Sequence, residues 1–73
     1  FDNEPRNREI VKNIEKAVAE DYSVVIWPKY VKEKDINDMI VGGKTNLEIL
    51  NIIHKNTFSG LEAKTQLSHW KKV

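Results

Sequence analysis

The chain has 73 residues, which is enough for one domain with a small core and too short for two. Twelve basic and eleven acidic residues leave a formal net charge of +1, a balance that by itself does not indicate a nucleic-acid-binding protein. Cysteine is absent, which excludes disulfides and thiolate zinc sites. We find no signal peptide and no apolar run near the ~18 residues that span a bilayer, so we expect a cytoplasmic protein with no membrane partner. Because the chain begins with Phe1 rather than methionine, we expect a piece of a larger protein.

The charges are unevenly distributed along the chain. Residues 1–22 carry four basic and six acidic groups, whereas residues 44–73 carry five basic and two acidic groups. This pattern indicates either solvated helix faces or a basic surface in the C-terminal part.

The first predicted element is an amphipathic helix from about Arg6 to Glu20. Pro5 suits the first turn of a helix, where its missing N–H costs nothing. A one-sided helical stripe of apolar residues then follows at Ile10, Val11, Ile14, Ala17 and Val18.

The next predicted element is a strand over residues 23–27, Ser-Val-Val-Ile-Trp, which Pro28 ends. Such a continuous apolar run is typical of a strand buried on both faces of a parallel sheet. With a second strand ending near residues 1–3, the order strand, helix, strand predicts a right-handed βαβ unit. We therefore expect an α/β fold in which two parallel strands are followed by two or three helices.

Three further helices are predicted from capping signals. Asp35 caps a short helix that buries Met39, Ile40 and Val41 and ends at Gly42-Gly43. Thr45 with Glu48 forms a capping box for a helix with apolar residues all round, which we expect to be well buried; these are Leu47, Ile49, Leu50, Ile52 and Ile53. Ser59 with Glu62 predicts a second box, before a last helix with a shared apolar face of Ala63, Leu67, Trp70 and Val73.

Carboxylates follow both predicted strands. Asp2 and Glu4 leave one face of an extended chain, and Asp35 with Asn37 follows the next strand at the same sheet edge. Their oxygens are the ligands that Mg²⁺ prefers. The alternative is that these acids only favour helix N-termini.

These residues carry a resemblance to a known family. Asp-Asn-Glu-Pro-Arg-Asn at 2–7, Val-Val-Ile-Trp-Pro at 24–28 and Lys-Asp-Ile-Asn-Asp-Met-Ile at 34–40 resemble the second half of a toprim domain. Toprim domains serve DnaG-type primases, topoisomerases and related nucleases. The resemblance is strongest to the DNA primases of T4-like bacteriophages, whose C-terminal end resembles residues 56–64 and Trp70-Lys71-Lys72.

The resemblance implies a division of the chain and a set of metal ligands. Residues 1–43 would be the C-terminal half of a toprim-like domain, and residues 44–73 a helical extension packed on it. Asp2 and Glu4 match the paired catalytic acids, with Glu in place of the second Asp. Asp2, Glu4 and Asp35 would hold Mg²⁺ or Mn²⁺ in the intact enzyme. The family's glutamate on an earlier strand has no counterpart here, so the fragment alone should bind metal weakly and be inactive.

Basic residues are the candidates for binding nucleic acid or a protein partner. They are Arg6, Arg8, Lys34, Lys64, Lys71 and Lys72. The alternative is that these charges only solvate helix surfaces. Trp70 beside two lysines suits stacking on a base, but the stripe it shares also predicts a core residue.

The predicted function is that of a fragment of a DNA primase, which synthesises RNA primers from ribonucleotides on single-stranded DNA. The first alternative is a non-catalytic module that docks the primase to the replicative helicase or DNA through residues 45–73. The second is a fragment of a toprim nuclease or topoisomerase.

Overall fold

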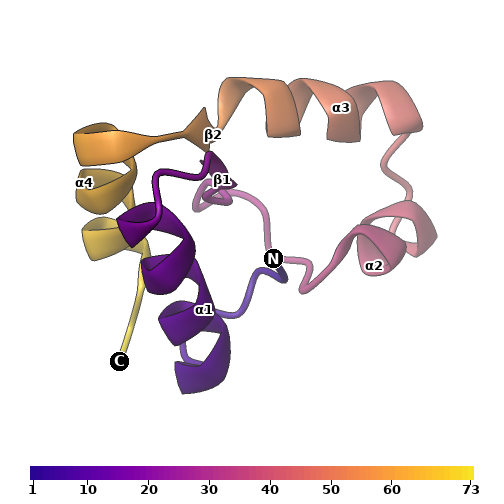
Figure 1. Ribbon diagram of the computed structural model, residues 1–73. Helices are drawn as coiled ribbons and strands as arrows, with labels where there is room; N and C mark the ends of the chain where they lie inside the picture. Colours follow the sequence, from indigo (N-terminus) through magenta and orange to yellow (C-terminus); the bar gives the residue numbers. More distant parts are fainter.

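The computed structural model describes residues 1–73 and contains four helices and one small sheet (Figure 1). The elements follow the order α1 (Arg8–Ala19), β1 (Val24–Val25), α2 (Ile36–Val41), α3 (Asn46–Lys55), β2 (Thr57–Phe58) and α4 (Gly60–Trp70). None of the helices combines the length and apolar character needed to cross a lipid bilayer. The presence of both helices and strands confirms the predicted mixed α and β composition.

Helix α1 has the predicted apolar face, with Val11, Ile14 and Val18 buried. It begins two residues later than predicted, because the side chain of Asn7 caps it. Oδ1 of Asn7 accepts a hydrogen bond from the N–H of Ile10 at 3.1 Å. Pro5 consequently lies in a turn ahead of the helix rather than in its first turn.

The predicted parallel strand pair is wrong. Strand β1 pairs antiparallel with β2, with Val24 opposite Phe58 and Val25 opposite Thr57. Residues 1–5 form no strand, because their backbone bends locally: the N–H of Glu4 donates to the carbonyl of Asp2 at 3.0 Å. The end of α3 instead delivers two strand-forming residues, Thr57 and Phe58, to the edge of β1.

The core is small, with twelve buried residues that are all hydrophobic; eleven of them form two clusters, and Val11 belongs to neither. The α1–α4 cluster comprises Ile14, Val18, Val24, Ile26, Ala63 and Leu67. The α2–α3 cluster comprises Trp27, Val31, Met39, Ile49 and Ile52. In Figure 1, α1 and α4 lie on one side of the sheet, α2 and α3 on the other, and the N-terminus between the two halves. Both clusters include residues from before and after residue 43, and the division into domains at that residue stays a prediction.

The helix caps were predicted well on α2 and α3. Asp35 is the N-cap of α2, and its Oδ1 accepts from the N–H of Asp38 at 2.8 Å. Thr45 and Glu48 form both bonds of the capping box on α3. Ser59 lies at the N-cap of α4, but its side chain makes no capping hydrogen bond, so the second predicted box does not form.

Burial was over-predicted in α2, in α3 and at the C-terminus. Met39 is fully buried, yet the neighbouring Ile40 and Val41 are exposed. In α3, Ile49 and Ile52 are buried, whereas the other face carries the exposed side chains of Leu47 and Leu50. These two helices pack on one side only, so apolar residues on their outer sides remain in solvent. Val73 is also exposed, beyond the end of α4.

Candidate functional site

The N-terminal segment (residues 1–5) is held in the middle of the molecule by the side chain of Asn3. Nδ2 of Asn3 donates to the carbonyls of Val31 at 2.9 Å and Glu33 at 3.0 Å. Oδ1 of Asn3 accepts from the indole Nε1 of Trp70 at 3.0 Å. The N–H of Asn3 also donates to the carbonyl of Lys34 at 2.6 Å. One asparagine therefore joins three segments that are far apart in the sequence.

Two more hydrogen bonds complete the attachment of the N-terminal segment. Nε1 of Trp27 donates to the carbonyl of Phe1 at 3.0 Å. The N–H of Lys72, just beyond α4, donates to the carbonyl of Pro5 at 2.8 Å. Both tryptophans of the chain thus anchor the first three residues through their indole N–H groups.

Two of the three predicted metal ligands lie at one hollow, which we call the acidic hollow. Asp2 and Asp35 line it together with Asn37, and its volume is about 370 Å³. Its other walls are apolar, from Phe1, Val25, Trp27, Ile36 and Ile53. Glu4 does not line this hollow. One oxygen of Asp35 is already engaged in capping α2.

The chain contains no group of three or more histidine or carboxylate side chains placed to hold a metal ion. Asp2, Glu4 and Asp35 therefore do not assemble into a common site in this structure. Oxygen donors at the acidic hollow suit Mg²⁺ in kind, but two carboxylates are an incomplete set of ligands. The metal-binding and catalytic roles of these acids stay predictions.

A second hollow, which we call the basic groove, has a volume of about 450 Å³. It lies among residues 3–6, the turn after β1 and the C-terminal end of α4. Its lining residues are Asn3, Pro5, Arg6, Trp27, Pro28, Lys29, Val31, Lys32, His69, Trp70 and Lys72. An adjoining hollow of about 140 Å³ shares Trp27, Pro28, Lys29, His69 and Trp70. No carboxylate lines either of them.

The predicted basic residues are thus spread over several places. Arg6 and Lys72 line the basic groove. Arg8 and Lys34 are exposed and line none of the hollows, and Lys34 contributes only its backbone carbonyl to the contact with Asn3.

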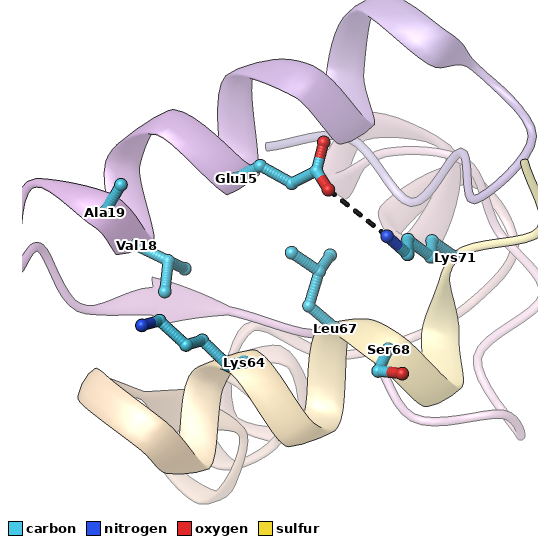
Figure 2. A pocket seen from close by; sticks show the side chains of 7 residues that line it. All are labelled: Glu15, Val18, Ala19, Lys64, Leu67, Ser68 and Lys71. Atoms are coloured by element: carbon cyan, nitrogen blue, oxygen red, sulfur yellow. Dashed lines mark hydrogen bonds and ion pairs between the residues drawn. The ribbon is translucent and has the colours of Figure 1, made fainter.

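Lys64 and Lys71 lie elsewhere, in a hollow of about 290 Å³ between α1 and α4 (Figure 2). Nζ of Lys71 pairs there with Oε2 of Glu15 at 3.2 Å. Lys64 and Ser68 extend from the same helix, and Val18 and Leu67 form the apolar part of the wall. The pairing with Glu15 lowers the local positive charge, so this hollow carries less net positive charge than the basic groove.

A second ion pair holds the loop that follows residue 31. Nζ of Lys44 donates to Oε2 of Glu33 at 2.7 Å. This hydrogen bond holds the pKa of the Glu33 carboxyl below its ordinary value of 4.5. Because the pKa of Glu33 is lower in the folded chain than in the unfolded chain, the pair stabilises the fold at pH values above the pKa of the unfolded chain. Its contribution is lost as the pH falls through the folded pKa.

Several residues of the site were missed in the sequence. Asn3 lies between the carboxylates Asp2 and Glu4 and was not predicted as a site residue. Lys29, Lys32 and His69 belong to no recognisable binding motif. One local signal existed: Lys29 and Lys32 flank Tyr30 and Val31 directly after Trp27-Pro28, so cations and aromatic residues alternate there. The contact of this turn with the end of α4 has no signal in the sequence.

A comparison with known proteins relates the chain to a phage enzyme. No family model matches it. It is 39% identical over 75 aligned residues to the DNA primase of Enterobacteria phage T4, in an alignment that takes in the whole chain and 22% of that primase. The chain thus spans about a fifth of the length of this relative and is related to that part of it. This similarity to part of a phage primase supports the predicted relation to primases, whereas the toprim assignment and the C-terminal position stay predictions.

Proposed function

We propose that this chain is the C-terminal part of a phage-type DNA primase, an enzyme that synthesises short RNA primers on single-stranded DNA. The observation that carries the proposal is the 39% identity to a phage DNA primase along the entire chain. The reaction in the intact enzyme is nucleotidyl transfer, in which a primer hydroxyl attacks a ribonucleotide and pyrophosphate leaves.

In this proposal the acidic hollow is one edge of the catalytic centre. Divalent metal ions supply charge neutralisation during nucleotidyl transfer. Asp2 and Asp35 would be two of the ligands for Mg²⁺ or Mn²⁺ in the intact enzyme, and groups outside this chain would complete the set. The chain alone should therefore bind metal weakly and be inactive, because it has no third carboxylate at the hollow.

The experiment is a chimaera. The segment of the phage T4 primase that matches this chain is replaced by these 73 residues, and primer synthesis is measured on single-stranded DNA. We expect primers in a yield within a few-fold of the parent primase, because the exchanged segment is homologous along its whole length.

The matched control is the same chimaera with Met39→Asp. Met39 is fully buried, so a charge there unfolds the exchanged segment and abolishes its contribution. If the unmodified chimaera is folded and makes no primers under conditions where the parent primase does, the proposal is wrong.

A module that docks the primase to the replicative helicase is the second candidate. It is favoured by the exposed apolar side chains of Leu47 and Leu50 on α3 and of Leu61 on α4. The Met39→Asp chimaera separates the two functions. If the segment only docks, its unfolding would leave primer synthesis without the helicase at the parent level and reduce synthesis only when the helicase is present, whereas a catalytic segment would lose synthesis in both cases.

A further inference from the structure

The basic groove concentrates positive charge in a chain that is nearly neutral overall. Arg6, Lys29, Lys32 and Lys72 all line it, while the net charge of the whole chain is +1. The two ion pairs of the structure are Glu33 with Lys44 and Glu15 with Lys71, so none of the four groove cations has a carboxylate partner. Four unpaired cations in one concave surface favour a polyanionic ligand.

The groove is organised before any ligand arrives. Its three segments are joined through Asn3, which binds the carbonyls of Val31 and Glu33 and the indole of Trp70. The hydrogen bond from the N–H of Lys72 to the carbonyl of Pro5 fixes the position of the Lys72 backbone beside the groove. The backbone that carries these cations is therefore already ordered, so a ligand that contacts all of them loses no binding free energy in ordering it.

The walls of the groove are aromatic as well as basic. Trp70 is half-buried there, beside the rings of Pro5, Pro28 and His69. Aromatic side chains among cations are the pattern that proteins use for unpaired bases, which stack on them while the phosphates meet lysine and arginine. In a duplex the faces of the bases are already covered by their neighbours, so this pattern favours a single strand.

We propose that the basic groove binds single-stranded nucleic acid, with Arg6, Lys29, Lys32 and Lys72 at successive phosphates and Trp70 against a base. This inference rests on the proposed function for the class of ligand, and it assigns the binding to a surface separate from the acidic hollow. It also adds Lys29, Lys32 and Trp70 to the binding residues, in place of Arg8, Lys34, Lys64 and Lys71.

The chain carries its own reporter for this test. Both of its tryptophans line the groove, so their intrinsic fluorescence responds directly to an occupant. The 73-residue chain is titrated with a short oligothymidylate at several salt concentrations. We expect quenching that saturates and an affinity that falls steeply with salt, by about 0.7 log units per log unit of salt for each phosphate contact.

The test variant is Lys29→Ala with Lys32→Ala, and the matched control is Lys12→Ala with Lys16→Ala. The control lysines are also exposed, lie on α1 and line none of the hollows. Removing the groove lysines should weaken binding on the order of tenfold at low salt and reduce the salt slope by about 1.4. The control variant should bind nearly as the parent does.

Three results would overturn the inference. They are no saturable quenching, equal losses in the two double variants, and an acidic peptide of matched charge that binds as tightly as the oligonucleotide. The proposed function is tested separately. Primers from the chimaera with no binding at the groove would refute only this inference, whereas binding at the groove with an inactive chimaera would refute only the primase proposal.

Discussion

At the scale of single residues, Asn3 contributes more to the position of the N-terminal segment than its charged neighbours do. Asp2 and Glu4 attract attention because they are charged, yet the side-chain hydrogen bonds of the N-terminal segment are made by Asn3. Asn3 can act as donor and acceptor at once, so one amide satisfies two carbonyls of the 31–33 loop and one indole N–H. Sequence reasoning missed it because an asparagine in an N-terminal turn is ordinary, and its three partners are 28 to 67 residues away.

Asn3→Ala should therefore destabilise the chain by about 1.5–4.5 kcal/mol, since three half-buried hydrogen bonds are lost at roughly 0.5–1.5 kcal/mol each. Urea unfolding followed by tryptophan fluorescence measures this change. Asn13→Ala is the matched control, because Asn13 is exposed on α1 and makes no side-chain hydrogen bond; it should stay within about 0.5 kcal/mol of the parent. If the two variants unfold at the same urea concentration, the hydrogen bonds of Asn3 do not stabilise the fold.

At the scale of elements, local signals predicted the helices and non-local contacts decided the sheet. The stripe in α1 and the caps at Asp35 and Thr45 depend on neighbours within four residues, so the sequence alone indicates them. The partner of β1 depends on where α3 delivers Thr57 and Phe58, and no local pattern reports that. The expectation of a parallel pair came from the order of elements and from the family resemblance.

Helix α4 offers an internal comparison of two leucines. Leu67 is buried against α1, whereas Leu61 lies at the start of the same helix and is 80% exposed. Leu67→Ala should cost about 2–5 kcal/mol through lost burial and the cavity left behind, and Leu61→Ala less than about 0.5 kcal/mol. Chemical or thermal unfolding distinguishes them. In so small a core the first change can remove the cooperative transition altogether, and similar curves for both variants would contradict the packing of α4 on α1.

At the scale of the whole molecule, the N-terminal segment lies between the two halves and lines both the acidic hollow and the basic groove. The acidic hollow opens beside the α2–α3 cluster, and the basic groove opens between the turn after β1 and the end of α4. Arg6 and Lys72 were predicted as binding residues from charge alone. Lys29 and Lys32 were not, because only the folded chain brings residues 28–32 against residues 69–72.

The most direct test of nucleic-acid binding at the basic groove is an NMR titration of the ¹⁵N-labelled chain with a short single-stranded oligonucleotide. The two indole N–H signals report on the bonds to Phe1 and Asn3, and both should be protected from hydrogen exchange in the free chain. On titration we expect both indole signals to shift together with the backbone amides of residues 29–32 and 69–72, while those of α2 and α3 stay in place. Shifts centred on Lys64 or on α3, or no shifts at all, would contradict the account.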